Sequence, residues 1–308
     1  MRMSLGLPTH RVDALEELAG ADAIAEVSVA AETAGFDAVF VTDHPMPADH
    51  WLATGGHHTL DPFVALTFAA AATTRIRLQT NLLILAYRNP FLSAKAVASL
   101  DALSGGRMIV GVGAGYLAGE FAALGVDFDE RNDLTDESIT TMRAAWSGES
   151  VTVAGRHFEA TGNTMLPRPA QAGGPTIWIG GNSKRAIRRA VELADGWMPM
   201  PSPAGSERRL KTPAITSLED FAERLGFARD HAASVGRTEP FEVVFMPMGL
   251  DMFSNAGVKP AAVVESIEQL AAAGATYVTM MVPGDTRAEF LDHVSMFGDE
   301  IIPQVAKL

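Results

Sequence analysis

The chain has 308 residues, a length that suits one α/β barrel with insertions, and its 47% hydrophobic and 20% charged residues are typical of a globular protein. It contains no cysteine, which excludes disulfides, iron–sulfur clusters and thiolate catalysis and fits a reducing cytoplasm. The net charge of −13 disfavours nucleic acid and anionic membranes as partners, and we expect neither a signal peptide nor a membrane span.

Short, nearly all-apolar runs recur along the chain and predict parallel strands that are covered on both faces. They are Met1–Leu7, Phe36–Val41, Ile76–Leu85, Met108–Gly113, Thr176–Gly180, Gly196–Met200, Phe241–Leu250 and Thr276–Val282.

Alanine-rich amphipathic segments between these runs predict helices. They are Ala14–Ala34, Pro62–Thr73, Pro90–Leu103, Ser183–Ala194, Ser217–Val235, Pro260–Ala273 and Thr286–Leu308. Three begin with a proline, which suits the first turn of a helix, and Gly35 and Gly274 stand where C-caps are expected.

Strands and helices alternate about eight times, which predicts a single (β/α)8 TIM barrel over residues 1–308. An open, Rossmann-like sheet is the alternative. Three irregular segments interrupt the alternation, at 44–61, 147–175 and 201–213, and the second contains a short strand pair. Long insertions at the carboxyl ends of barrel strands usually shape a substrate site, and the third segment has the composition of a mobile lid.

The first candidate site residues are Asp43 and His44, directly after the second strand. Barrel enzymes draw catalytic groups from this strand end, and an imidazole there exchanges protons near neutral pH. The alternative for His44 is a structural hydrogen bond.

Polar and glycine residues mark the next two strands. Thr80 and Asn81 interrupt an apolar strand and must either bond neighbouring backbone or face a ligand. Gly111, Gly113 and Gly115 allow close approach to the backbone, although packing of the barrel explains them equally well. Their spacing is not that of a dinucleotide-binding loop.

The turn Gly180, Gly181, Asn182 and Ser183 precedes a predicted helix, so free backbone N–H groups there form an anion site suited to phosphate. Lys184, Arg185, Arg188 and Arg189 follow as a basic cluster. The alternative is an ordinary capped helix with a solvated basic face. The histidines of the 44–61 segment match no standard zinc spacing, so we expect no metal.

Taken together, the segments GFDAVFVTDH, TRIRLQTNLLILAYRNP, LDALSGGRMIVGVGAGY and WIGGNSKRAIRRAVELADGW resemble the luciferase-like monooxygenase superfamily. They occur in the expected order and cover most of residues 1–200. The Asp43–His44 pair is similar to the branch that uses the deazaflavin coenzyme F420. The last third of the chain matches only in layout.

The resemblance implies roles for these residues. His44 lies beside the deazaflavin ring and assists hydride transfer, and Asp43 bonds the ring system. A non-prolyl cis peptide under the ring aligns with Thr80–Asn81, the backbone of Gly113 and Gly115 flanks the ring, and the Gly180–Ser183 turn holds the cofactor phosphate.

Two departures from the sugar-phosphate dehydrogenases of this branch argue against glucose 6-phosphate as substrate. Their acidic residue after the glycines aligns with Tyr116, so Glu120 becomes the candidate for a displaced carboxylate. Their tryptophan close to the Asp-His pair is a proline here, and Trp51 is the nearest one. Trp51, His57 and Phe63 predict an aromatic, partly apolar pocket.

The leading hypothesis is an F420-dependent oxidoreductase that transfers hydride between the cofactor and a small organic substrate. The acidic tail of the F420 cofactor would then lie near Lys184, Arg185 or Arg188. The alternative is an FMN-dependent monooxygenase that uses reduced flavin and oxygen. A third hypothesis is a flavin-binding or subunit-type barrel that has no catalytic activity. The resemblance also makes a homodimer an expectation.

Overall fold

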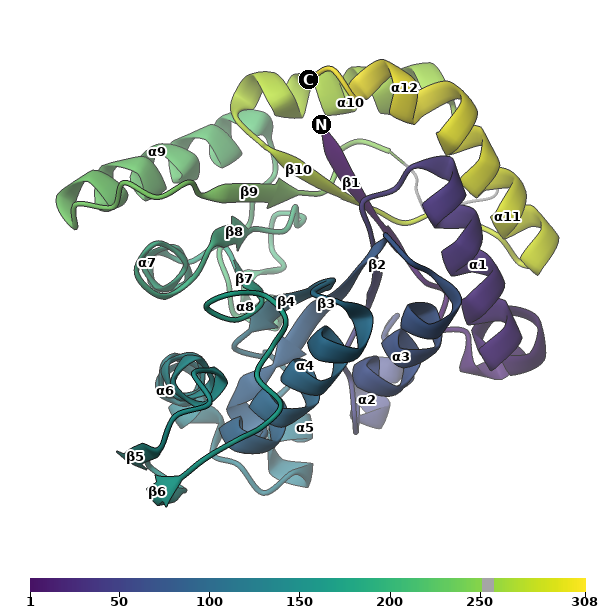
Figure 1. Ribbon diagram of the computed structural model, residues 1–308. Helices are drawn as coiled ribbons and strands as arrows, with labels where there is room; N and C mark the ends of the chain where they lie inside the picture. Colours follow the sequence, from purple (N-terminus) through teal and green to yellow (C-terminus); the bar gives the residue numbers. More distant parts are fainter. Residues whose placement is uncertain (251–257) are drawn as a thin grey trace.

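Parallel strands form the centre of the molecule in the computed structural model, which describes residues 1–250 and 258–308. Within these residues eight strands close into a barrel in the order β1-β2-β3-β4-β7-β8-β9-β10 (Figure 1). The strands are β1 (Arg2–Gly6), β2 (Ala38–Val41), β3 (Arg77–Ile84), β4 (Met108–Gly113), β7 (Thr176–Gly180), β8 (Gly196–Met198), β9 (Glu242–Phe245) and β10 (Tyr277–Met280). The predicted TIM barrel is confirmed, and the open sheet is wrong because β1 pairs with both β2 and β10.

Helices surround the strands and bury the apolar faces that the sequence predicts. They are α1 (Ala21–Ala34), α2 (Asp49–Leu52), α3 (Pro62–Ala72), α4 (Pro90–Ser104), α5 (Ala118–Ala123), α6 (Arg131–Trp146), α7 (Lys184–Leu193), α8 (Glu207–Leu210), α9 (Leu218–Ser234), α10 (Pro260–Ala273), α11 (Arg287–Met296) and α12 (Ile302–Val305). The prolines of α3, α4 and α10 lie in their first turns, and Gly35 and Gly274 adopt the left-handed conformation of a C-cap.

Two boundaries differ clearly from the prediction, and one helix was not predicted. The helix expected from Ala14 begins only at Ala21, because Gly20 is extended and ends a short π turn. The strand expected over Phe241–Leu250 ends at Phe245, just before Pro247, which has no N–H to donate to a ladder. The long helix α6 was not predicted, because its sequence RNDLTDESITTMRAAW is polar over most of its surface.

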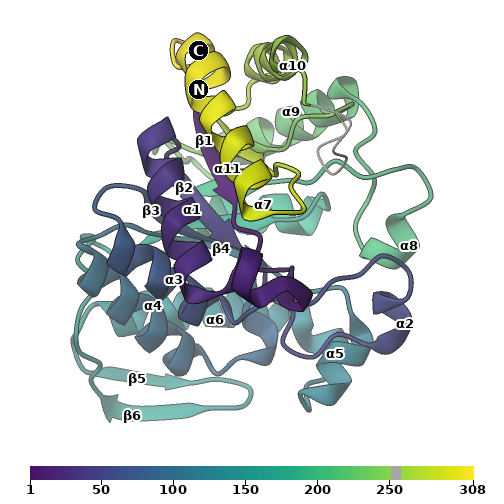
Figure 2. The same cartoon turned by 90° about the vertical axis from the view of Figure 1, so that its right-hand side faces the viewer.

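The irregular segments are present, but 147–175 connects α6 to β7 and so lies on the helix-to-strand side of the barrel, not at the carboxyl ends of the strands as expected. The strand pair in 147–175 is the antiparallel hairpin β5 (Val151–Ala154) and β6 (Glu159–Asn163), outside the barrel. The segments that carry α2, α5 and α8 lie along the same edge of the molecule, on the right-hand side of Figure 2. They follow β2, β4 and β8 in the chain and therefore surround the carboxyl ends of the strands.

Two cores stabilise the barrel. The larger lies between strands and helices, and the smaller fills the barrel with Ala38, Ile109, Trp178, Met198, Val244 and Tyr277, against which Leu82 packs. Glycines make room for Leu82. A Cβ at Gly180 would lie 2.2 Å from Leu82 Cδ1, and one at Gly111 would lie 2.2 Å from the Thr80 carbonyl oxygen and 3.3 Å from Leu82 Cδ2. The glycine at 111 is therefore required by the close approach of β3 and β4.

We predict that Gly111→Ala lowers the free energy of unfolding by about 1–3 kcal/mol or more, because the added methyl overlaps backbone that cannot retreat. Gly226→Ala is the matched control, since Gly226 lies within α9 with no atom within 4 Å of its Cβ position. The control should raise the free energy of unfolding by up to about 1 kcal/mol. Urea denaturation measures both, and equal effects of the two substitutions would contradict the packing argument.

Candidate functional site

His44 is enclosed by aromatic rings that three separate segments bring to the end of β2. Its side chain is 12% exposed, and its ring centroid lies 4.6 Å from Trp51 of α2, 5.1 Å from His57 and 6.3 Å from Tyr116. The His57 ring is almost perpendicular to that of His44. The predicted proximity of Trp51 and His57 to this strand end is confirmed, and Trp51 reaches His44 from a helix rather than from the adjacent loop.

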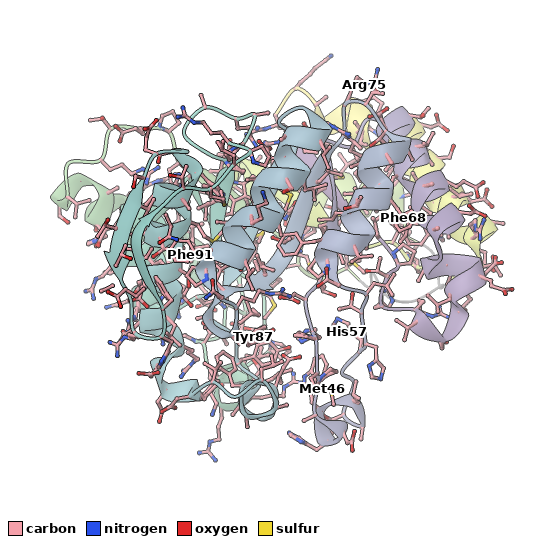
Figure 3. All side chains as sticks on the ribbon, turned by 60° about the horizontal axis from the view of Figure 1, so that its bottom comes forward. Met46, His57, Phe68, Arg75, Tyr87 and Phe91 are labelled. Atoms are coloured by element: carbon pink, nitrogen blue, oxygen red, sulfur yellow. The ribbon has the colours of Figure 1, made fainter. Side chains whose placement is uncertain are left out.

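A buried carboxylate lies behind His44. Glu120 of α5 is 2% exposed, its Oε2 lies 3.5 Å from His44 Nδ1, and its Oε1 accepts the backbone N–H of Met46 at 3.1 Å. Figure 3 shows Met46, His57 and Tyr87 at the same end of the molecule, with Arg75, which precedes β3, at the opposite end. The expected displaced carboxylate is therefore present beside His44.

Asp43 points away from His44 and ties β2 to the end of β3. Its Oδ1 accepts from Arg88 at 2.7 Å, and its Oδ2 accepts from the Ile84 backbone N–H at 3.1 Å and from Arg88 Nε at 3.3 Å. The side chain of Asp43 is 2% exposed. Burial raises the pKa of Asp43 above its usual range, while the Arg88 guanidinium opposes that rise. Asp43 thus has a structural task besides any contact with a cofactor.

Two imidazoles near the mouth of the barrel, those of His10 and His57, favour their neutral forms. His57 Nε2 lies 3.3 Å from Thr42 Oγ1, and its ring meets that of His10 edge-on at 6.1 Å. Burial, together with the neighbouring His44, His10 and His58, lowers the pKa of His57 to about 4. Burial also lowers the pKa of His10. The wall beside His44 is therefore polar and aromatic but uncharged at neutral pH.

The structure resolves the role of one member of the polar pair in β3, and a ligand contact of Asn81 stays a prediction. Thr80 is buried, and its hydroxyl donates to the Gly111 carbonyl at 2.9 Å, so it bonds neighbouring backbone. Asn81 is partly exposed. The non-prolyl cis peptide is Asn81–Leu82, so its expected place at Thr80–Asn81 is one residue too early. Regular pairing with β4 continues through Thr80, and the register shifts only between Thr80 and Leu83.

The glycines that follow β4 are explained by packing. A Cβ at Gly113 would lie 3.0 Å from Ile84 Cδ1, and Gly115 has φ +84° with Phe121 2.6 Å from its Cβ position. Because Val41 pairs with Thr80 and Gly113 with Ile84, the structure brings these candidate residues together at the carboxyl ends of adjacent strands. A cofactor role for the glycine backbone stays a prediction.

The turn before α7 combines a helix cap with an internal anchor. Ser183 is the N-cap, and its hydroxyl accepts from the Ala186 N–H at 3.1 Å. The buried Asn182 donates from its amide to the carbonyls of Met200 and Pro213 at 2.9 Å and accepts from the Met200 N–H. Its own N–H donates to Thr212 Oγ1 at 2.8 Å. Asn182 therefore holds both ends of the 201–213 segment.

The basic cluster of α7 is only partly neutralised. Arg185 and Arg189 pair with Asp133 and Asp136 of α6. Lys184 Nζ and Arg188 Cζ instead lie 5.2 Å and 5.7 Å from the centroid of the Phe227 ring, and both side chains are exposed. Among the described residues, no ion pair within 4 Å involves Lys184 or Arg188. These two cations remain available to an anionic ligand.

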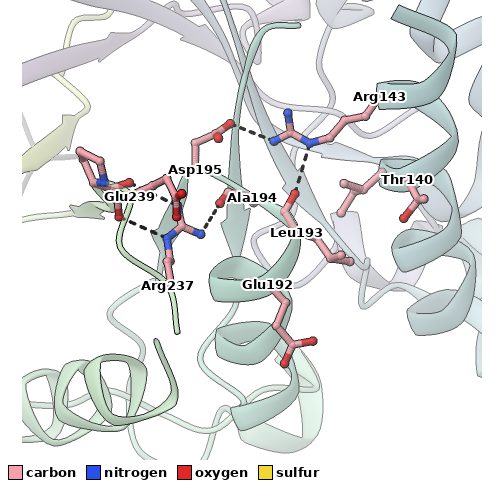
Figure 4. Close-up of a pocket in the computed structure, with 10 residues that line it drawn as sticks. Thr140, Arg143, Glu192, Leu193, Ala194, Asp195, Arg237 and Glu239 are labelled. Atoms are coloured by element: carbon pink, nitrogen blue, oxygen red, sulfur yellow. Dashed lines mark hydrogen bonds and ion pairs between the residues drawn. The ribbon is translucent and has the colours of Figure 1, made fainter. Parts of the chain in front are cut away.

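A groove at the amino-terminal end of the barrel has a structural explanation (Figure 4). Arg237 donates to the carbonyls of Val191 and Ala194 at 2.6 and 2.8 Å and so caps the end of α7. Arg143 pairs with Asp195, which in turn accepts the Ile177 N–H. The charged groups of this groove therefore join α6, α7 and the strands.

Sequence reasoning missed Arg88 and Tyr87, which follow β3 in the run AYRNP. The sequence did hold one signal for Arg88, because an aspartate buried at a strand end, such as Asp43, needs a cation as its partner.

Among residues 1–250 and 258–308, no group of three or more His, Asp or Glu side chains is arranged to hold a metal ion. In the same residues, no helix has the length and apolar character that a bilayer crossing requires.

Comparison with known proteins places this site in a family. The family model described as luciferase-like monooxygenase matches residues 1–246. The chain belongs to this family. The resemblance inferred from the sequence motifs is thereby confirmed. The luciferase-like chain is also 30% identical over 325 residues to an F420-dependent glucose-6-phosphate dehydrogenase of Intrasporangium calvum, which covers 90% of this chain and 92% of the relative.

Two solved structures support the fold. The monooxygenase RslO1 from Streptomyces bottropensis has a TM-score of 0.80 at 21% identity, covering 98% of this chain and 99% of that one. An F420-dependent secondary alcohol dehydrogenase, solved with an F420-acetone adduct, has a TM-score of 0.73 at 19% identity, covering 99% and 98%. At these identities the likeness shows the shared barrel alone.

We predict that His57 makes the folded state less stable in acid. Its pKa in the folded state is about 4, against 6.5 for an unperturbed histidine, so between these values the unfolded chain binds a proton that the folded chain does not. The contribution is fully present above pH 6.5 and is lost as the pH falls towards 4. His57→Gln should therefore lose less stability between pH 7 and pH 4.5 than the wild type, as measured by urea denaturation. His50→Gln, at an exposed position in the same segment, should keep the wild-type slope.

Proposed function

We propose that the protein is an F420-dependent oxidoreductase that transfers hydride between the deazaflavin and a small organic substrate. The observation that carries the proposal is the position of His44 at the end of β2. There its ring contacts the rings of Trp51 and His57, and its Nδ1 faces the buried carboxylate of Glu120. The full-length similarity to a dehydrogenase named as F420-dependent supports the choice of cofactor. When bound, the deazaflavin supplies a carbon centre that accepts or donates hydride.

The residues at the carboxyl ends of the strands fit such a cofactor. We place its ring near Asp43, Thr80, Asn81 and the backbone of Gly113 and Gly115. Its phosphate would lie at the Gly180–Ser183 turn, where Ser183 caps the ten-residue helix α7, whose first N–H groups and positive dipole end favour anions. Asn182 would not bind the phosphate with its own N–H or side-chain amide, because both are hydrogen-bonded within the protein. We propose that it contributes by holding the conformation of the turn.

An anionic tail beyond the phosphate would meet Lys184 and Arg188. Both are exposed and unpaired within the described residues, whereas Arg185 is neutralised by Asp133 and Asp136. Of the three alternatives named from the sequence, Lys184 and Arg188 are therefore the ones we propose for the tail. FMN is the alternative cofactor. FMN has no polyglutamate tail, so the two unpaired cations favour F420.

The pocket wall indicates the substrate class. Trp51, Tyr116 and the neutral His57 present aromatic surface and hydrogen-bonding groups without a positive charge. Such a wall suits an uncharged, partly apolar alcohol or carbonyl compound better than a sugar phosphate. We therefore infer a substrate other than glucose 6-phosphate. A homodimer and a cytoplasmic location stay predictions.

We predict that purified protein binds F420 at micromolar or lower Kd and binds FMN more weakly, by fluorescence titration. The double variant Lys184→Gln with Arg188→Gln should weaken F420 binding by roughly tenfold at low salt, from two exposed ionic contacts, and less at high salt. Arg185→Gln, which removes a charge from the same helix, is the control and should have a smaller effect. Tighter binding of reduced FMN than of F420 would move the protein to the monooxygenase alternative.

We predict that His44→Ala leaves the Kd for F420 within about threefold of the wild type and lowers turnover by roughly 10²- to 10⁴-fold. The reason is that the imidazole exchanges a proton with the substrate while the ring is held elsewhere. Cofactor titration and steady-state kinetics with a substrate turned over by the wild type measure the two effects. Unchanged turnover would remove His44 from the mechanism.

A further inference from the structure

Glu120 is a buried carboxylate whose surroundings require a hydrogen-bond donor. It is 2% exposed, and the Met46 N–H satisfies only one of its oxygens. Among the described residues, the one basic side chain within 4 Å of it is His44, whose Nδ1 lies 3.5 Å from Oε2. A carboxylate removed from water is costly unless its lone pairs are satisfied, so a donor at this nitrogen stabilises the site.

His44 has a buried ring nitrogen that requires a hydrogen-bond partner. Its Nδ1 is buried and meets no strict hydrogen-bond partner among the described residues, although Glu120 Oε2 faces it. Trp51 packs against the ring at 4.6 Å, and His57 contacts it edge-on at 5.1 Å. The ring is thus held by aromatic neighbours, with Nδ1 facing the interior. Nε2 lies on the opposite edge of an imidazole from that side.

The other buried carboxylate near His44 does not compete for this nitrogen. Asp43 is engaged by the Arg88 guanidinium and the Ile84 N–H at the end of β3. The Tyr87 hydroxyl is buried beside Glu120 and is a second donor available to that carboxylate, although it makes no hydrogen bond of strict geometry among the described residues. Burial and the charges of Asp43 and Glu120 raise the pKa of Tyr87, so it stays a neutral phenol beside them. Glu120 is therefore the acceptor that faces His44.

We propose that Glu120 is the positioning residue for His44: it accepts a hydrogen bond from Nδ1–H, holds the ring in that tautomer and leaves the Nε2 lone pair free. This inference rests on the proposed function. If an alcohol is oxidised here, the deazaflavin would supply the hydride acceptor, and Nε2 of His44 would take up the hydroxyl proton as the C=O double bond forms. The opposite tautomer carries a proton on Nε2 and cannot accept another there.

The arrangement follows a general rule of histidine chemistry. The hydrogen bond made by one ring nitrogen decides which nitrogen carries the proton and which is free to react. A carboxylate at Nδ1 also stabilises the imidazolium that forms when Nε2 takes up a proton. Glu120 would act through His44 and need not touch substrate or cofactor.

The test uses the full-length protein without cofactor or substrate. Long-range ¹H–¹⁵N spectra of the histidine rings report the tautomer, and the His44 signals are identified by their loss in His44→Asn. We expect Nδ1–H with an unprotonated Nε2 in the wild type near neutral pH. Glu120→Ala should convert His44 to the Nε2–H tautomer, and Glu120→Gln should do so in part. An Nε2–H tautomer in the wild type would overturn the proposal.

Two comparisons separate positioning from a structural effect. Tyr87→Phe removes a hydroxyl beside Glu120 and should leave the His44 tautomer unchanged. If the Glu120 variants keep the wild-type tautomer while folded, as judged by dispersed amide spectra, the proposal fails. If they do not fold, the wild-type tautomer alone decides. Because no cofactor is present, failure of F420 to bind in a separate titration would overturn the proposed function without changing this result.

Discussion

The ion pair between Asp43 and Arg88 is the constraint on which the arrangement of the site depends. It joins the residue after β2 to the residues after β3, and the Ile84 N–H adds a backbone bond to the same carboxylate. Removing one partner of such a buried pair typically costs about 3–5 kcal/mol, because the other charge is left uncompensated. Since His44 follows Asp43 directly, the direction in which its ring leaves the strand depends on this pair.

The site keeps its two carboxylates in different environments. Asp43 faces a guanidinium and serves the framework, whereas Glu120 faces an imidazole and a backbone N–H. One acid therefore lies against a permanent cation and the other against an imidazole, so the two neighbouring carboxyl groups have different partners. His57 adds polar surface without positive charge at neutral pH, because burial holds its pKa low.

The barrel was predictable because its signals are local. Apolar strands, first-turn prolines and the glycine caps at Gly35 and Gly274 each follow from short stretches of sequence. Helix α6 escaped prediction because its apolar residues are diluted by acidic and hydroxyl side chains. The positions of Asp43 and His44 were predictable from the strand end. The approach of Arg88 and Tyr87 was not, because it depends on how the register of β3 shifts after Thr80.

The hydrogen bonds of Asn182 limit which part of the 201–213 segment can change conformation. Its hydrogen bonds hold the backbone carbonyls of Met200 and Pro213 and the side-chain hydroxyl of Thr212, so the 201–213 segment is clamped at both ends. Rearrangement without breaking this clamp is confined to the middle of the segment, where Gly205 already has φ +85°. A change of conformation in the middle of the segment would therefore leave the geometry of the turn before α7 unchanged.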